Sequence, residues 1–433
     1  MGLSIRTGRQ HFRHPIMNAR EIFDLPSAHH SVNVRTNTKN LGWSGMRELS
    51  VEQQLIQDTA RDFVRRRVLP VAKELDPKQG AMPQDLIDEM AQLGFFGILI
   101  PVEYGGLGLG AFEYCLVAEE LSRGWMSVGS IIARGNGMSG LFDHMSEEKK
   151  ADILSRQAAG QYLGAYSLSE SAAGSDVANL SCRAVRVADG WEITGTKYWC
   201  TFADGADFLV VFARTDPQID PTARHKGISA FILNKPRGAL PEGVMGSPIP
   251  KIGYHGWTTW ELAFDGCRVP AESLVGEEGK GFYHITSFLE LARAHTAARS
   301  IGLARGALED ALAYASERAQ FGQPIGDFQA IRFKIADMAT QIAAARSLMY
   351  DVCDRIDKGG RCDLESSMVK LFASEMSERV TSEALQIHGG AGYTTHFAVE
   401  RYWRDARLTK IFEGTSEIQK RIISDSLMGK VRS

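Results

Sequence analysis

The chain has 433 residues, of which 44% are hydrophobic and 23% charged, with a formal net charge of -3. At roughly 150 residues per domain, this length allows two or three domains and a large core. The balanced charge excludes the basic surface that nucleic acids or anionic membranes require, so no nucleic-acid partner is expected. No run of about 18 apolar residues occurs, so we expect no membrane span.

Residues 1–45 are basic and poor in acidic side chains, and they lack a sustained apolar period. Such a leader resembles a transit peptide, which would indicate the mitochondrial matrix. We favour a disordered tail, or a start assigned too early with Met46 as the natural one. Six cysteines without a C-x-x-C pair predict a reducing compartment. We therefore expect a cytoplasmic, bacterial protein.

Residues 46–161 are predicted to form an N-terminal helical domain, because apolar residues such as Leu86, Met90 and Leu93 recur at helical spacing. The segment from Gly106 to Ala111 matches the dinucleotide-binding pattern G-x-G-x-x-A. That fingerprint requires a strand before it and a βαβ unit around it. The segments that follow look helical, so we interpret the glycines as a tight turn that opens a helix.

Residues 162–278 change to a period of two, which predicts a middle β-domain. Phe208 to Ala213 is typical of a buried strand, and Trp191 and Ile193 followed by Gly195 indicate a strand and a turn. From residue 279 to 433 the helical period returns, for example at Ile335, Met338 and Ile342. The expected fold class is α+β, mainly α: helices, then a β-barrel-like domain, then a C-terminal four-helix bundle.

Several polar and glycine-rich motifs lie along this framework. The segment from Tyr166 to Asp176 combines hydroxyls with a glycine, which suits close approach to a ligand but also a solvated polar turn. Trp199 and Thr201 alternate on one strand face, where Trp199 can stack on a flat ring or pack in the core.

Two further motifs lie in the C-terminal part. Arg318 precedes a Gly-x-Pro turn and suits a diphosphate, although in isolation a solvated Arg at a helix end is the commoner case. The glycines after His388 suit phosphate or adenine, or a helix C-cap. His388 has no partner at metal-ligand spacing, so no metal site is predicted.

Near the C-terminus, Phe412-Glu413-Gly414-Thr415 places a carboxylate between an aromatic residue and a glycine. Thr415 is the predicted N-cap of a helix with an apolar stripe of isoleucines. A Glu partly desolvated in this position would have a raised pKa, which suits a general base. The alternative is an exposed loop Glu.

In this order, the motifs resemble those of the acyl-CoA dehydrogenase family, over about residues 50–427. The flavin-loop motif matches Tyr166 to Asp176, and the flavin-stacking pair matches Trp199 and Thr201. The R-x-x-F-G turn begins at Arg318, the glycine loop at Gln386, and Glu413 stands in the base motif. Departures are Ser171 in place of Pro, Cys200 and Phe202 beside Thr201, and Phe412 in place of Tyr.

The resemblance implies FAD as cofactor and usually a homotetramer, a dimer of dimers. The implied FAD-binding residues, of which Arg318, Phe321, Gln386, Gly389 and Gly390 would act from a neighbouring subunit, are Tyr166, Leu168, Ser169, Ser175, Trp199, Thr201, Arg318, Phe321, Gln386, Gly389, Gly390, Thr415 and Glu417. The expected substrate-binding residues are Ser175, Arg293, Glu290, Phe412, Gly414 and Arg134.

The resemblance also implies the reaction, in which Glu413 removes the α-proton of an acyl-CoA and the β-hydrogen leaves as hydride to the flavin. The product is a trans-2-enoyl-CoA, and electron-transferring flavoprotein is the usual acceptor. One branch of the family places its base on the first C-terminal helix, but Ala292 stands there in this chain. Segments such as residues 290–299 resemble methylsuccinyl-CoA dehydrogenases.

We therefore expect a short, branched or carboxylated substrate. Arg134 lies in a stretch that lines the acyl pocket in the family, so it is the candidate partner of a substrate carboxylate. The alternative is an Arg that faces solvent or another subunit. Competing functions are an acyl-CoA oxidase, which would react with oxygen, and a non-catalytic flavin-binding assembly protein. A desulfinase of the family lacks the catalytic Glu, and the presence of Glu413 argues against it.

Overall fold

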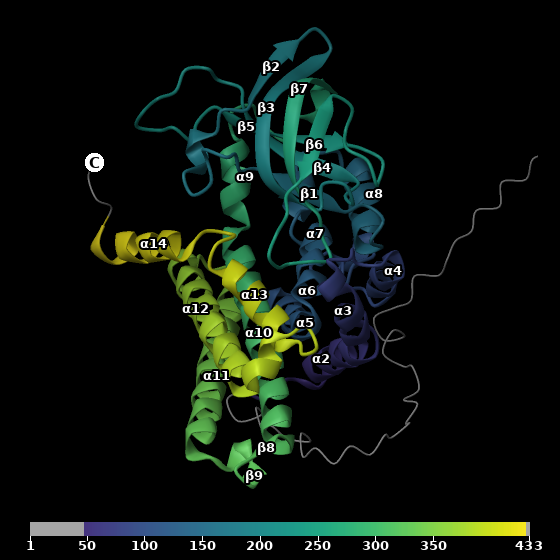
Figure 1. The fold of residues 1–433 in the computed structure, drawn as a ribbon. Helices are drawn as coiled ribbons and strands as arrows, with labels where there is room; N and C mark the ends of the chain where they lie inside the picture. The colour runs from purple at the N-terminus through teal and green to yellow at the C-terminus, as the bar shows by residue number, and fades with distance from the viewer. Residues whose placement is uncertain (1–46, 430–433) are drawn as a thin grey trace, which may run out of the picture. The chain divides into compact units, whose positions relative to one another are not determined.

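The structure, a computed structural model, describes residues 47–429, so the predicted leader lies outside the described residues. The first part is helical, as predicted, and α2 begins at a capping box in which Ser50 and Gln53 each bond the other's backbone. Figure 1 shows most of these helices below the β-strands, with α8 beside the strands. They are α2 (Val51–Phe63), η3 (Val64–Val68), α3 (Leu69–Leu75), η4 (Asp76–Lys78), α4 (Gln84–Gln92), η5 (Val102–Tyr104), α5 (Ala111–Gly124), α6 (Met126–Ile131), α7 (Ala133–Asn136), η6 (Ser139–Phe142) and α8 (Glu147–Ala158).

The glycine-rich segment before α5 is a turn, as the sequence predicted. Gly108 has a φ of 61°, and α5 starts directly after the turn at Ala111. A Cβ on Gly106 would lie 2.0 Å from the carbonyl oxygen of Ile100, so any residue other than glycine would clash with the backbone at this position. These glycines therefore serve close backbone packing.

A curled sheet follows, with the strand order β1-β4-β2-β3-β7-β6 and with β5 paired to β4 (Figure 1). The strands β4 and β5 are buried along nearly their whole length, which accounts for their continuous apolar runs. The short 3-10 helix η7 (Val177–Asn179) lies between β1 and β2, and the 3-10 helix η8 (Ala271–Ser273) follows β7. The strands are β1 (Gly164–Ser167), β2 (Arg183–Val187), β3 (Gly190–Thr201), β4 (Phe208–Arg214), β5 (Ile228–Asn234), β6 (Val244–Pro248) and β7 (Thr259–Pro270).

The turn predicted at Gly195 was wrong, because β3 continues through it to Thr201. Gly195 has a φ of 144° and lies at a register shift against β7. A Cβ there would lie 2.7 Å from the Cα of Cys182. The glycine thus marks a bulge with close backbone approach rather than the end of a strand.

Helices return after the sheet, which confirms the predicted order of helical, β and helical parts. The long helix α10 packs against α11 and α12 and also against α5 of the N-terminal part. It therefore joins the two helical parts. The elements are α9 (Gly281–Ser287), α10 (Leu289–Glu317), β8 (Ala319–Gln320), β9 (Gln323–Pro324), η9 (Ile325–Asp327), α11 (Gln329–Asp357), α12 (Asp363–His388), η10 (Gly389–Tyr393), α13 (Val399–Thr409) and α14 (Ser416–Met428).

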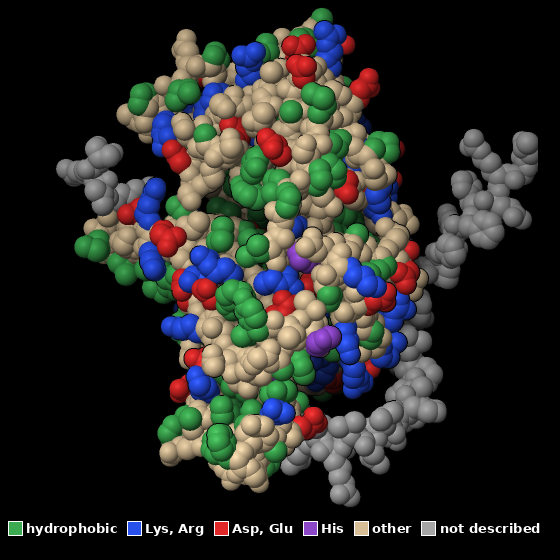
Figure 2. Space-filling view, in the orientation of Figure 1, with side chains coloured by type: hydrophobic (Ala, Val, Ile, Leu, Met, Phe, Trp, Pro, Cys, Tyr) green, Lys and Arg blue, Asp and Glu red, His purple; other side chains and the backbone are tan. Residues whose placement is uncertain are grey.

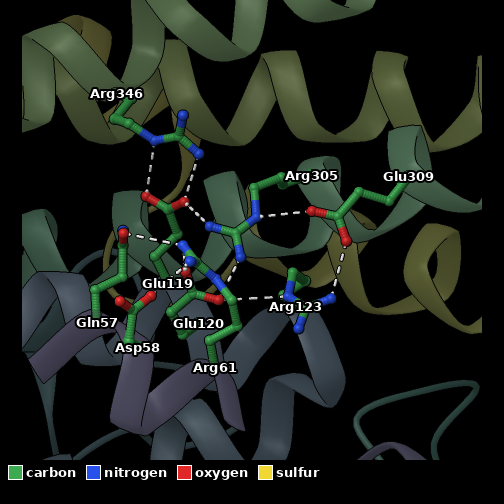
Figure 3. A network of polar contacts seen from close by, with 9 residues as sticks. All are labelled: Gln57, Asp58, Arg61, Glu119, Glu120, Arg123, Arg305, Glu309 and Arg346. Carbon is green, nitrogen blue, oxygen red and sulfur yellow. Dashed lines mark hydrogen bonds and ion pairs between the residues drawn. The ribbon is translucent and has the colours of Figure 1, made fainter. Parts of the chain in front are cut away.

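A buried network of charges fixes α10 against its neighbours (Figure 3). Arg305 on α10 donates to Glu119 at 2.7 Å and also pairs with Glu120, both on α5. Arg346 on α11 donates to Glu119 at 2.5 Å, and Arg61 on α2 reaches Glu120 at 3.0 Å. Buried charges persist only when they are paired and hydrogen-bonded. This network therefore fixes the position of α10 relative to α2, α5 and α11.

Acid is expected to remove part of this stabilisation. Burial opposes the ionisation of Glu120, but the charge and hydrogen bond of Arg305 outweigh it and lower its pKa to about 2. Since the folded pKa lies below the unfolded one, the stabilisation is complete above about pH 5 and is lost as the pH falls toward 2. We expect the free energy of unfolding to decrease by on the order of 3 kcal/mol across this range through Glu120. Chemical denaturation at several pH values measures it, and a Glu120→Gln variant with undiminished acid dependence would contradict it.

Within residues 47–429, no helix is both long enough and apolar enough to cross a membrane. Across the same residues, no group of three or more His, Cys, Asp or Glu side chains is arranged to hold a metal ion.

Candidate active site

Glu413 lies in the loop that joins α13 to α14. Its φ is 54° and that of Gly414 is 88°, so the turn uses two successive left-handed residues. Lys370 on α12 donates to the carbonyl of Gly414 at 2.6 Å, and the side chain of Thr415 caps α14 as predicted. The backbone of the loop is therefore held from α12 and from the start of α14, and the Glu413 side chain extends from this fixed backbone.

The carboxylate of Glu413 meets two side chains of α10. Arg299 donates from Nη2 to Oε1 at 2.7 Å, and the Thr296 hydroxyl donates to Oε2. Arg299 also bonds Thr296 at 2.9 Å and, through Nη1, the Ser130 hydroxyl of α6 at 2.9 Å. Its guanidinium lies 4.6 Å from the centre of the Phe412 ring. The side chain of Arg299 is only 2% exposed, whereas that of Glu413 keeps 33%.

The raised pKa predicted for Glu413 was wrong for this state of the protein. Burial does raise the pKa of Glu413. The charge of Arg299 and the hydrogen bond from the Thr296 hydroxyl lower it by more, so the pKa lies below its ordinary value. Glu413 is thus ionised at neutral pH and held in an ion pair. The sequence argument considered only desolvation and missed the cation.

The groups around this pair are mostly cationic or neutral. His295 is buried, and burial together with the nearby Arg299 charge lowers its pKa to about 3, so the ring is neutral. It stacks on Tyr114 and bonds the carbonyl of Gly129. Burial lowers the pKa of Lys370 to about 8, which leaves it largely protonated at neutral pH.

Arg134 lies at the same site, on the short helix α7. Its charge acts on Tyr114 and His295, on which the charge of Glu413 also acts, and on Tyr166 and Cys200 of the β-domain. The side chain is half-buried and makes no hydrogen bond or ion pair with any residue that the structure describes. Half-buried cations without a carboxylate are uncommon, and they favour a site for an anion.

Arg293 and Glu290 lie about two and about two and a half turns before Arg299 on α10. Arg293 is buried and donates to Asp363 at 3.4 Å and to Ser366 at 3.3 Å. Glu290 accepts from the backbone N–H of Cys362 at 3.1 Å. Both predicted substrate residues thus have partners on or just before α12, and their role toward a substrate stays a prediction.

The predicted flavin loop after β1 is held by a buried ion pair. Lys197 on β3 donates to Glu170 at 2.9 Å and to the carbonyl of Leu168 at 3.0 Å. Glu170 also accepts from the backbone N–H groups of Ser181 and Cys182. The loop with Leu168 and Ser169 is therefore fixed to β3, beside Trp199. Ser175, further along, is exposed.

Trp199 stands at a bulge of β3 with a φ of 65°, and it is 56% exposed although it is a large aromatic residue. Thr201 lies two residues on and bonds Thr259 at 3.0 Å. Figure 2 shows a recess with hydrophobic side chains between the β-domain and the C-terminal helices. An exposed ring beside fixed hydroxyls suits a planar cofactor, so these residues fit the isoalloxazine ring of FAD.

Glu417 lies in the first turn of α14, beside the Thr415 cap, whereas the FAD residues predicted to act from a neighbouring subunit lie at the far ends of α10 and α12. Arg318 follows α10 some 19 residues after Arg299, which corresponds to about 28 Å along a helix. Phe321 is 94% exposed, and nothing lies within 4 Å of a Cβ placed on Gly389 or Gly390. Within one chain these residues, with Gln386, are not brought to Glu413 or Trp199. Their exposure and open backbone fit a contact with FAD of another subunit.

Sequence reasoning missed Arg299, Thr296, Ser130 and Lys370. Thr296 and Arg299 are three residues apart on α10, a spacing that places two side chains on one helix face. That spacing, in a helix otherwise rich in alanine, was the available signal. It did not show that this face meets Glu413.

The comparisons with known families cover nearly all of the described chain. Residues 50–161 match the acyl-CoA dehydrogenase N-terminal domain, residues 165–267 its middle domain, and residues 279–428 its C-terminal domain.

Among individual proteins, an acyl-CoA dehydrogenase of Bacillus subtilis is 40% identical over 87% of this chain and 98% of its own. A (2S)-methylsuccinyl-CoA dehydrogenase of Cereibacter sphaeroides is 38% identical over 89% of this chain and 71% of its own. The solved butyryl-CoA dehydrogenase of Megasphaera elsdenii superposes with a TM-score of 0.82 and 35% identity, over 88% of this chain and 99% of its own.

Fold and matches together define an oxidoreductase that acts on the CH–CH bond of an acyl-CoA. The chain belongs to the acyl-CoA dehydrogenase family, whose members depend on FAD.

Proposed function

We propose that this protein oxidises a short, branched or carboxylated acyl-CoA, of the methylsuccinyl-CoA type, to the trans-2-enoyl-CoA. The observation that supports this substrate class is the positive charge around Glu413. Arg299, Lys370 and Arg134 supply three cations near this single carboxylate. A pocket with surplus positive charge favours an acyl group that brings its own carboxylate. The similarity to a methylsuccinyl-CoA dehydrogenase supports the same class.

In the proposed mechanism Glu413 receives the α-proton. Thr296 orients its carboxylate, and Lys370 holds the adjoining carbonyl of Gly414. His295 is neutral and therefore does not compete as a charged partner. FAD bound beside Trp199 and Thr201 would supply the acceptor for the β-hydrogen and its electron pair. Hydrogen bonds to the thioester carbonyl favour loss of the α-proton, because negative charge develops there.

The substrate class can be tested by anaerobic titration of the flavoprotein with methylsuccinyl-CoA and, in parallel, with butyryl-CoA. We expect methylsuccinyl-CoA to bleach the flavin absorbance at lower concentration. Bleaching by butyryl-CoA alone would make the protein an ordinary short-chain dehydrogenase. Bleaching by neither would refute both short substrates.

Replacing Arg134 with Ala should reduce the preference for methylsuccinyl-CoA over butyryl-CoA by about 10-fold or more. A hydrogen bond to a charged group contributes about 1.5–3 kcal/mol, and only the carboxylated substrate loses it. The measured quantity is the ratio of the two kcat/KM values. Arg186→Ala, at an exposed Arg on β2 that pairs with Glu278, is the matched control. An unchanged ratio in Arg134→Ala would remove Arg134 from the proposal.

We also propose electron-transferring flavoprotein as the electron acceptor and a homotetramer, or dimer of dimers, as the assembly. Exposed aromatic residues on the C-terminal part, including Phe321 and Tyr393, support burial against another subunit. Sedimentation analysis tests the assembly. Rapid oxygen consumption with substrate, without an added acceptor, would favour the acyl-CoA oxidase alternative.

A further inference from the structure

Arg299 is a buried cation in direct contact with the proposed base. We propose that Arg299 determines specificity by partner exchange: it holds Glu413 in the free protein, and the distal carboxylate of a short dicarboxylic acyl group then replaces Glu413 on it. Glu413 is thereby released to accept the α-proton. This inference rests on the proposed function and names the residue that would select its substrate class.

The first argument concerns the charge of Arg299 during the reaction. Its side chain is 2% exposed, and Glu413 is the carboxylate that pairs with it among the described residues. When Glu413 takes up a proton it becomes neutral, which would leave Arg299 buried without an anion. An unpaired buried charge is strongly unfavourable. A substrate carboxylate on Arg299 removes this penalty, whereas a neutral acyl group cannot.

The second argument concerns the strength of the base. A carboxylate in an ion pair with a guanidinium is a weaker base than a free one, because protonation must break the pair. In the free protein Glu413 is held in this way by Nη2 of Arg299 at 2.7 Å. Exchange of partners restores its basicity only when a dicarboxylic substrate is present. Recognition and base activation would then be a single event.

The third argument is that Arg299 can change partners without moving. Nη1 bonds Ser130 on α6 at 2.9 Å, and Nη2 bonds Thr296 on its own helix at 2.9 Å. The ring of Phe412 lies 4.6 Å from the guanidinium and supports it from another side. Glu413, in contrast, belongs to a loop and keeps a partly exposed side chain. The anion is the mobile member of the pair and the cation is the fixed one.

The short distance between Arg299 and Glu413 also fits a substrate with a short acyl chain. In a four-carbon dicarboxylic acyl group the distal carboxyl is attached to the β-carbon, next to the carbon whose proton Glu413 removes. A cation within hydrogen-bond distance of the base is therefore within reach of that carboxylate. Arg134 has no contact with Glu413, so its charge can attract the substrate but cannot exchange partners with the base.

The test compares Arg299→Gln with the unaltered protein, with Arg134→Gln, and with Arg186→Gln as an exposed control. Steady-state kcat/KM is measured for methylsuccinyl-CoA and butyryl-CoA with an artificial electron acceptor. We expect Arg299→Gln to lower kcat/KM for methylsuccinyl-CoA about 30-fold more than it lowers kcat/KM for butyryl-CoA. FAD content and the melting temperature verify that each variant is folded.

Equal losses on both substrates would overturn the proposal, because Arg299 would then only position Glu413. An unchanged preference in Arg299→Gln, or no preference in the unaltered protein, would overturn it as well.

Equilibrium binding of succinyl-CoA and butyryl-CoA gives a readout that does not depend on turnover. We expect succinyl-CoA to bind more tightly to the unaltered protein and to lose this advantage in Arg299→Gln. If that binding result appears but no acyl-CoA bleaches the flavin, the proposed function fails while the role of Arg299 stands. If Arg299→Gln keeps the binding advantage, the role of Arg299 fails while flavin bleaching can still support the proposed function.

Discussion

Replacing Glu413 with Gln is expected to lower kcat by about 100- to 10,000-fold, the range that a general base contributes. Gln keeps the shape of the side chain and can still accept the Thr296 hydrogen bond, but it cannot take up the α-proton. The measurement is the rate of flavin reduction after rapid mixing with the substrate that proves active. Because only the base is removed, binding of the acyl-CoA should change far less than the rate.

A matched control for this substitution is Asp425→Asn on α14, which removes a carboxylate that pairs with Arg421. It should leave the rate of flavin reduction unchanged. The FAD content of Glu413→Gln is expected to equal that of the unaltered protein. Full turnover in Glu413→Gln would refute the proposed mechanism and would direct the search to another base.

The second large effect is expected on stability, from Glu119→Gln in the buried network. Glu119 accepts from both Arg305 and Arg346, and all three side chains are buried (Figure 3). Gln preserves the volume but removes the negative charge, so two buried guanidinium groups lose their shared anion. Breaking a buried pair in this way destabilises a protein by about 3–5 kcal/mol. Thermal and urea unfolding measure the change.

The control for this second variant is Glu74→Gln, whose ion pair with Lys78 has side chains 68% and 65% exposed. Exposed pairs contribute about 0–1 kcal/mol, so this change should be small. Similar effects of the two substitutions would show that the network adds little beyond a surface pair. Because α10 carries both Arg305 and Arg299, a loosened network is also expected to reduce activity.

Much of the fold followed from local patterns in the sequence. The apolar runs of β4 and β5, the glycine turn before α5 and the Thr415 cap all depend on residues that are neighbours along the chain. The prediction at Gly195 failed because a glycine can mark either a turn or a bulge. Only the pairing of β3 with β7 decides between them.

The candidate site was predicted less completely. Motif order indicated Glu413 and the flavin residues, and the structure gives them compatible surroundings. The ionisation of Glu413 was predicted in the wrong direction, because Arg299 lies 114 residues away in the chain. Ser130, which holds Arg299, lies 169 residues from it.

The sequence by itself determined the order of helical and β parts and the family motifs, and it indicated Glu413 as the candidate base. Those features depend on side-chain chemistry and short-range spacing. The tertiary structure alone decided that Glu413 is paired with Arg299 and that Arg134 has no partner among the described residues. The physical reason is that burial and Coulomb interactions act through space, between helices whose contacts no local pattern specifies.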